Sequence, residues 1–426
     1  MSLKRAASLS MLQSLVSVGT SFLSVKITSV YLGPAGMGLL GQLQQFIAMV
    51  QGVVASGLNT GIVRRTAQLR EQPQARAQVV STVMRLVLLG GLPVALVIAF
   101  GSGWLARELL HDPALRMPVL LFSGVYVAGL LGTLVLATAN GARDYRTVTL
   151  IQIGTALGSL ALFALLCPTL GVPGGLYAAA LIPSATALAG WLVARRQPWW
   201  PARPLSHGFS RPEARAALAF VPMAATSAIA APLVQILVRD TLARHSGMAS
   251  VGLLNGVMRL SDLYVNIATS VLGMYFLPRF AELRESAPLK REIRKGLATL
   301  IPAVAAASLA LYLLRDWVVR LVFTAEFHAM RDLFAWQMTG NVLKVAGWFF
   351  GHLMIAKGNP LAMAGFELLM GLFWWAAGVV LVERNGAVGA TQAYALHNAV
   401  YLAVGVVAIT VILRRIAARE AKGAAA

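Results

Sequence analysis

The chain has 426 residues, of which 58% are hydrophobic and 12% are charged. Soluble domains carry about 25% charged residues, so this composition excludes an ordinary soluble protein and indicates an all-α polytopic membrane protein. The formal charge of +20 would suggest nucleic acid for a soluble chain. Here the basic residues fall in short loops between apolar runs, so membrane topology explains them and no nucleic-acid partner is expected.

Apolar windows of about 20 residues predict about twelve membrane-spanning helices. The first is too long for a signal-peptide core, so we expect it to remain in the protein. The predicted spans are 8–31, 37–63, 79–102, 117–140, 147–170, 174–194, 216–239, 250–277, 297–314, 332–356, 361–382 and 388–413. An even number of spans places both termini on one side of the membrane.

The loop charges predict the orientation of these spans. Of the 36 Lys and Arg residues, 24 fall on the side of the termini, eight on the other side, and four within spans. Cytoplasmic loops carry the excess of Lys and Arg. We therefore expect both termini in the cytoplasm, and a multi-pass protein of the bacterial inner membrane.

The longest of the loops between predicted spans divides the chain near its middle. Residues 195–215 are basic and contain four prolines, which is typical of a linker. We predict a six-helix lobe at 1–194, a cytoplasmic linker at 195–215, a second six-helix lobe at 216–413, and a cytoplasmic tail at 414–426.

A weak internal repeat supports two related lobes. The segment 35–40 matches 249–254 at an offset of 214, and Gly171 and Gly174 match Gly386 and Gly389 at 215. Both halves have an even number of spans, so the repeat is parallel and related by an axis along the membrane normal. We expect two pseudo-symmetric lobes around a central cavity.

Polar residues follow one face of the predicted span at 250–277. Asn255, Arg259, Asp262, Asn266 and Ser270 recur at steps of three and four, which places them on one side of a helix. An Arg at mid-bilayer costs about 2.5–3.5 kcal/mol. We therefore expect this face to line a wet cavity that binds substrate. The alternative is an internal Arg259–Asp262 pair that joins two helices.

The repeat assigns this face a counterpart on the second span. Gln45 corresponds to Arg259, and it shares a face with Asn59. We expect Gln45 and Asn59 to face Asn255, Arg259 and Asn266 across the cavity.

Three further candidate site residues, all ionisable, lie within predicted spans. Lys344 is roughly 18 Å deep by helix rise, so we expect it to bind substrate, or else to form a structural ion pair. Lys26 is shallower, so cavity lining and snorkelling to the interface both stay open. Asp262 and Glu367 are candidates for proton coupling, since a buried carboxylate can take up and release a proton. Asp262 could instead only neutralise Arg259, and Glu367 could reach the cytoplasmic interface.

Several kinds of chemistry find no support in the sequence. The six histidines show no metal-ligand spacing, and there is no Walker A motif or nucleophile elbow. We expect no metal, no cofactor and no catalytic residue. A lipid–sugar polymerase or ligase would need a substantial periplasmic loop, which this chain lacks.

Two stretches resemble Wzx-type flippases of lipid-linked oligosaccharides, above all those of the enterobacterial common antigen intermediate. The first is Lys26 with the run 31–39, YLGPAGMGL. The second is 300–357, with the runs 302–308, 314–316 and 329–337, the last reading AMRDLFAWQ.

The resemblance implies the multidrug/oligosaccharidyl-lipid/polysaccharide exporter fold, alternating access and an undecaprenyl-pyrophosphate-linked oligosaccharide as substrate. It implies membrane lipids as partners and suggests the polymerase and chain-length regulator of the same pathway. In the related peptidoglycan-precursor flippases, cations on helices one and eight line the cavity, and Lys26 and Arg259 stand at comparable places. Gln45 and Asn59 occupy the second span, where those relatives carry a cation.

The main competing function is a drug/cation antiporter of the same superfamily. Its cavity should be apolar and acidic, whereas the deep charges here include Arg259 and Lys344. This balance favours an anionic ligand, so we expect a flippase rather than an antiporter or an enzyme.

The predicted topology can be tested with reporter fusions. Fusions after Arg70, Pro204 and Glu420 should all report the cytoplasm, because each follows a predicted cytoplasmic run of basic residues. A periplasmic signal from any of the three would contradict the twelve-span arrangement.

Overall fold

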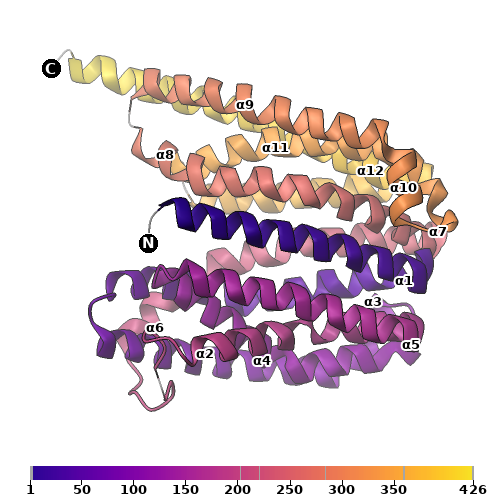
Figure 1. The fold of residues 1–426 in the computed structure, drawn as a ribbon. Coiled ribbons are helices and arrows are strands. Elements are labelled where there is room, and N and C mark those ends of the chain that lie inside the picture. Colours follow the sequence, from indigo (N-terminus) through magenta and orange to yellow (C-terminus); the bar gives the residue numbers. More distant parts are fainter. Residues whose placement is uncertain (1–2, 202, 220, 284, 358–359, 425–426) are drawn as a thin grey trace. The chain divides into compact units, whose positions relative to one another are not determined.

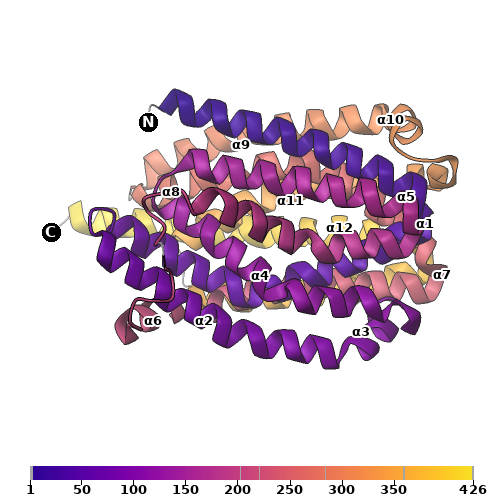
Figure 2. The same cartoon turned by 60° about the horizontal axis from the view of Figure 1, so that its bottom comes forward.

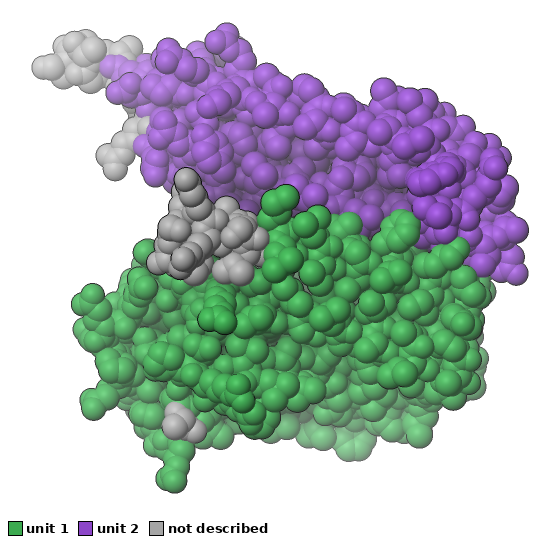
Figure 3. Space-filling model, viewed as in Figure 1, with its two compact units in different colours: residues 1–236 green, residues 237–426 purple. Residues whose placement is uncertain are grey.

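The computed structural model describes residues 3–201, 203–219, 221–283, 285–357 and 360–424, and this part of the chain is helical with no strand (Figure 1). It divides into two compact units, 1–236 and 237–426 (Figure 3). The elements are α1 (Leu3–Gln68), α2 (Pro73–Phe100), α3 (Ser102–Leu109), η1 (Pro113–Leu115), α4 (Arg116–Gly141), α5 (Tyr145–Ala194), α6 (Arg211–Leu218), α7 (Val221–Val271), the π-helical η2 (Leu272–Phe276), α8 (Leu277–Glu282), α9 (Ser286–Leu313), α10 (Arg315–Val322), η3 (Ala325–Leu333), α11 (Phe334–Lys357) and α12 (Pro360–Ala424).

Four glycines with positive φ divide the four longest helices. Gly33 in α1 and Gly247 in α7 have φ/ψ of 63°/−175° and 80°/164°. Gly171 in α5 and Gly386 in α12 have 60°/−132° and 55°/−132°. These conformations are almost restricted to glycine. The two pairs are 214 and 215 residues apart, as in the repeat found in the sequence.

The membrane-spanning character of the chain follows from these helices. Seven helices in the described part are long and apolar enough to cross a bilayer, and four of them contain one of the glycine breaks. Dividing those four at the glycine and adding the 24-residue α11 gives twelve segments. The predicted number of spans is therefore compatible with the structure, which has the all-α architecture expected of a polytopic membrane protein.

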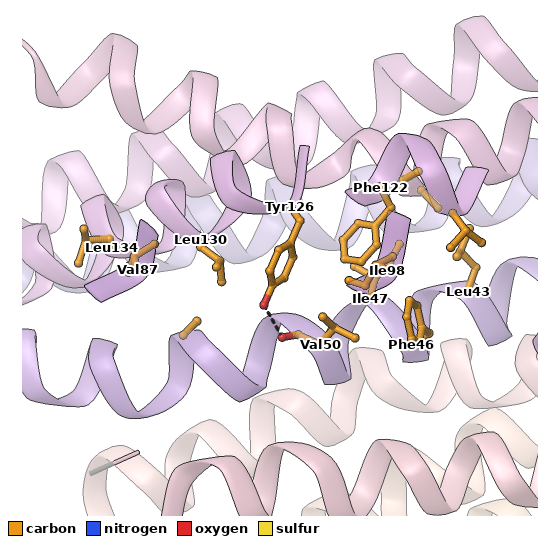
Figure 4. Packing of buried hydrophobic residues seen from close by; sticks show 14 of the residues in the cluster. Leu43, Phe46, Ile47, Val50, Val87, Ile98, Phe122, Tyr126, Leu130 and Leu134 are labelled. Carbon is orange, nitrogen blue, oxygen red and sulfur yellow. Dashed lines mark hydrogen bonds between the residues drawn. The ribbon is translucent and has the colours of Figure 1, made fainter. Parts of the chain in front are cut away.

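Unit 1 has a continuous apolar core in which α4 packs against α1, α2 and α5 (Figure 2). Phe122 contacts Phe46 and Tyr126 edge-to-face, with ring centroids 6.2 and 5.6 Å apart. The Tyr126 hydroxyl donates to the carbonyl of Val50 at 2.9 Å (Figure 4). This bond satisfies the hydroxyl inside the core, as burial of a tyrosine requires.

The predicted linker is packed on unit 1. Arg85 donates to the carbonyls of Leu205 and His207, both at 2.9 Å, and Trp199 donates to Asp144 at 2.9 Å. Burial raises the pKa of Asp144, but hydrogen bonds from Trp199 and Thr147 outweigh it and leave that pKa below its ordinary value. Trp199 is buried, so its ring fixes this segment against the start of α5 as well as donating the hydrogen bond.

The start of α7 also belongs to unit 1. A Cβ on Gly57 would lie 2.4 Å from the Cα of Val221, and one on Gly52 would lie 2.7 Å from the Cβ of Ala228. Glycine at both positions therefore permits close approach of α7 to α1. Residues 221–236 pack with the first unit, although the sequence assigns them to the second lobe; the lobe boundaries at 194 and 216 stay a prediction.

Unit 2 is built around α11, which packs against α9 and α12. A Cβ on Gly340 would lie 2.4 Å from the ring of Tyr394, and Cβ atoms on Gly347 and Gly351 would lie within 3.0 Å of Tyr401. Glycine at these three positions permits close packing of α11 against α12. This packing brings the middle of α11, which carries Lys344, against α12.

Gly171→Ala should lower the free energy of unfolding by about 1–3 kcal/mol, because alanine is strained at this positive φ. No side chain or backbone atom lies within 4 Å of the added methyl group, so the effect would be conformational rather than steric. Denaturant titration of the purified protein measures it. Gly124→Ala, at an equally open position in the middle of α4, is the matched control and should cause no loss. Equal stability of the two variants would contradict the prediction.

Candidate functional site

The polar face of α7 runs from the interior of unit 2 to its surface. Asn255 is buried, Arg259 is half-buried, and Asp262 and Asn266 are exposed. The neighbouring apolar face is buried: Val265 and Ala268 pack with Val304 of α9 and Val345 of α11. The apolar side thus holds the helix in the unit, while the polar side stays available for other contacts.

Asp262 is the centre of a charged cluster. Its carboxylate interacts electrostatically with Lys344 of α11 and with Arg239 and Arg259 of α7. Lys344 also lies over two aromatic rings, with its Nζ 4.9 Å from the centroid of Trp348 and 6.0 Å from that of Tyr394. Cation–π attraction holds the ammonium group in place. One carboxylate and three cations give the cluster an excess of positive charge.

Arg239 belongs to this cluster, although the sequence places it among the loop cations at the end of a span. It is 2% exposed, and its Nη2 lies 3.5 Å from the sulfur of Met258. The misplacement has a simple cause: Arg239 and Asp240 end the apolar run, but the helix continues to the break at Gly247. The continuation of the helix up to Gly247 was the signal that could have identified Arg239 as a residue inside the helix rather than in a loop.

A hydrogen-bonded network of uncharged side chains joins four helices beside the cluster. Asn341 of α11 donates to the Tyr264 hydroxyl of α7 at 2.7 Å, which lies 2.8 Å from the hydroxyl of Ser308 in α9. Tyr394 of α12 donates to the oxygen of Asn341 at 3.1 Å, and Gln337 does so at 3.3 Å. Such a network fixes the geometry of the helices that carry the charges. The sequence analysis missed these residues, since single polar residues in apolar runs give no periodic signal.

Glu367 has a different environment from Asp262. It is half-buried in α12 and accepts a hydrogen bond from Tyr401 at 2.7 Å. The nearby His397 stacks on Trp374, with centroids 5.1 Å apart and planes at 23°. The two candidate coupling residues therefore lie in the same unit with distinct partners.

The remaining predicted site residues lie in unit 1. Gln45 donates to Gln235 at 3.1 Å, while Lys26 and Asn59 are half-buried. Gln42 is fully buried, and neither of its amide atoms has a hydrogen-bond partner among the described residues. The predicted site residues of unit 1 are therefore two amides, Gln45 and Asn59, and one cation, Lys26. That Gln45 and Asn59 face the stripe on α7 stays a prediction.

The chemistry of the cluster favours an anion over a metal ion. Within the described residues, no group of three or more His, Cys, Asp and Glu side chains could hold a metal. Guanidinium and ammonium groups offer several donors to phosphate oxygens, and their attraction strengthens away from bulk water. The cluster is therefore suited to a phosphate or pyrophosphate group.

Binding of inorganic pyrophosphate should depend on this cluster in two directions. Arg259→Ala and Lys344→Ala should each weaken it by about tenfold, since hydrogen bonds to charged groups are the stronger ones. Asp262→Asn should strengthen it, because the competing carboxylate charge is removed. The measurement is the shift of melting temperature with ligand concentration.

Arg244→Ala is the matched control for these variants. Arg244 lies on the same helix, is largely exposed and binds Asp240 at 2.9 Å, so its loss should leave the affinity unchanged. The same affinity in all four variants would show that the cluster does not bind the anion.

Comparison with known proteins identifies the relatives of this chain. Over 407 residues it is 32% identical to the lipid III flippases of Escherichia coli K12 and Shigella flexneri, covering 94% of this chain and 96% of each relative.

The solved structures of similar fold are transporters. One is the inward-facing conformation of a multidrug resistance MATE family transporter of the MOP superfamily, with a TM-score of 0.75 at 16% identity and coverage of 95% and 98%. Another is a MOP superfamily transporter from Pyrococcus furiosus, with a TM-score of 0.65 at 16% identity, covering 97% of this chain and 96% of that one. At such identities they support the fold alone. Residues 2–284 match the profile of the polysaccharide biosynthesis protein family, and the chain belongs to this family of multi-pass membrane proteins.

Proposed function

We propose that this protein is a flippase that moves an undecaprenyl-pyrophosphate-linked oligosaccharide across the membrane by alternating access. The main observation in support is the electrostatic interaction of Asp262 with Arg239, Arg259 and Lys344. The chain is also similar over nearly its full length to lipid III flippases. An O-antigen or common-antigen repeat unit is the substrate that this relationship suggests.

The charged cluster would lower the main free-energy barrier to moving the lipid across the membrane, which is the desolvation of its pyrophosphate. A pyrophosphate cannot enter hydrocarbon without losing its hydration, and the transfer of an unpaired ion costs tens of kcal/mol in the limiting case. Fixed guanidinium and ammonium groups replace that hydration inside the protein. The apolar helix faces beside them suit the polyprenyl tail, while Asn255, Asn266, Gln45 and Asn59 suit the sugars.

The drug/cation antiporter is the second candidate, because the solved structures of similar fold include multidrug transporters. A cationic drug requires acidic or aromatic groups at its site. Here three cations interact with one carboxylate, so a cationic ligand would meet net repulsion. The sign of the cluster therefore favours the flippase.

The proposed direction of transport is outward. In a bacterial inner membrane the substrate would be taken from the cytoplasmic leaflet and released to the periplasmic leaflet. The polymerase and the chain-length regulator of the same pathway are the proposed partners at the release side.

Asp262 and Glu367 are the proposed coupling residues. Asp262 shares the cations that would bind the substrate, so its protonation would alter their charge balance. Glu367 would act through Tyr401, with which it is hydrogen-bonded.

The proposed function can be tested in liposomes containing the purified protein and a labelled lipid-linked oligosaccharide. The label should become accessible on both faces with the wild-type protein and with Arg244→Ala. Arg259→Ala and Lys344→Ala should retain the fold and lose transport. Asp262→Asn and Glu367→Gln should lose any acceleration that an imposed proton or sodium gradient gives.

One outcome would contradict the flippase, and a second would contradict the role of the charged cluster. The first is movement of a drug cation without movement of the lipid-linked sugar, which would favour the antiporter. The second is normal transport by both Arg259→Ala and Lys344→Ala, which would separate the cluster from the substrate.

A further inference from the structure

We propose that a hollow at one end of unit 2 binds the sugar part of the transported lipid, an inference that rests on the proposed function. The hollow has a volume of about 750 Å³. Tyr312 of α9, Arg315 of α10, four η3 residues and Trp336 of α11 form most of its wall. Its wall thus combines the junction of α9 and α10, η3 and the start of α11 with Val388, which follows the break of α12 at Gly386.

The residues of this hollow have the chemistry of a saccharide site. Trp336 is 44% exposed, and the electron-rich face of an indole ring attracts the C–H groups of a sugar ring. Arg331, Asp332 and His328 are exposed around the same hollow and offer both donors and acceptors to hydroxyl groups. An aromatic surface with a few placed polar groups is the usual composition of a ligand site.

The hollow is held in shape before any ligand arrives. The guanidinium of Arg331 binds Asp316 of α10 through two atoms, at 2.5 and 3.0 Å. The guanidinium of Arg315 lies 4.3 Å from the centre of the Tyr312 ring and donates to the Tyr312 carbonyl at 2.9 Å. Fixed side chains lose less conformational entropy on binding than mobile ones.

Apolar anchors fix the segment that carries most of these groups. Phe327, Met330 and Leu333 of η3 are almost fully buried, and they alternate with the exposed His328, Arg331 and Asp332. The short helix therefore presents its polar side to the hollow while its apolar side holds it in the unit. The second half of η3 overlaps the run 329–337. No residue of this overlap belongs to the charged cluster around Asp262.

The distance to the charged cluster suits one bound molecule. Trp336 and Lys344 are eight residues apart on α11, which is about 12 Å by helix rise. The buried amides of Gln337 and Asn341 lie between them along this helix. A ligand with its pyrophosphate near Lys344 would place a short oligosaccharide toward Trp336, as the order of groups in a lipid-linked sugar requires.

The test uses the free oligosaccharide, released from its lipid by mild acid so that it lacks both the polyprenyl tail and the pyrophosphate. Titration calorimetry with the purified full-length protein should detect binding. Trp336→Ala and Asp332→Asn should each weaken it by about tenfold, through loss of the stacking surface and of a charged acceptor. Trp336→Phe should restore part of the affinity.

Trp317→Ala is the matched control. Trp317 is also an exposed tryptophan, on α10 and outside the wall of the hollow, so its removal should leave the affinity unchanged. Absence of binding by the wild-type protein, or equal affinity in Trp336→Ala and Trp317→Ala, would overturn the inference.

The liposome assay separates this inference from the proposed function. Transport of the lipid-linked sugar without any binding of the free oligosaccharide would exclude the hollow and leave the flippase intact. Binding that depends on Trp336, in a protein that moves no lipid-linked sugar, would support the hollow and contradict the flippase.

Discussion

The interaction on which unit 2 depends is that of the Asp262 carboxylate with Arg239, Arg259 and Lys344. Charges inside a membrane protein are costly unless they are paired or face water, so this group requires a surrounding structure that holds each member in position. The packing supplies it: glycines on α11 admit the rings of α12, and the Asn341 network joins α7, α9, α11 and α12. The packing of the unit and the anion binding proposed for it thus involve the same residues.

The two units use the same turns for different chemistry. Equivalent glycines break the long helices in each, because a chain that reverses direction without a loop needs a backbone conformation that other residues resist. The polar content differs, however. Gln45 stands where the repeat puts Arg259, and its partner is Gln235, a neutral amide. The repeat therefore sets the path of the helices, while single substitutions on that path give the second unit its charge.

Sequence periodicity predicted the helices and the polar face on α7, because each depends on spacing along one helix. It did not predict that Arg239 is buried, since hydropathy marks the end of an apolar run rather than the end of a helix. Nor did it predict that Lys344 meets Tyr394 of α12 and Asp262 of α7, because this meeting of three helices depends on tertiary packing. The contacts that 195–215 and 221–236 make within unit 1 were not predicted for a similar reason. They depend on glycines of α1 and on loop carbonyls, and neither gives a signal in the sequence by itself.

The presence of one carboxylate among the cations has a physical reason in a carrier. Three cations alone would repel one another in the empty site and would hold a pyrophosphate so strongly that release became slow. Asp262 neutralises part of this positive charge and, at the proposed site, would compete with the ligand and so lower both effects. Binding then becomes an exchange of one anionic partner for another, with a smaller net change in free energy. A transporter requires such an exchange, because it must release its substrate as readily as it captures it.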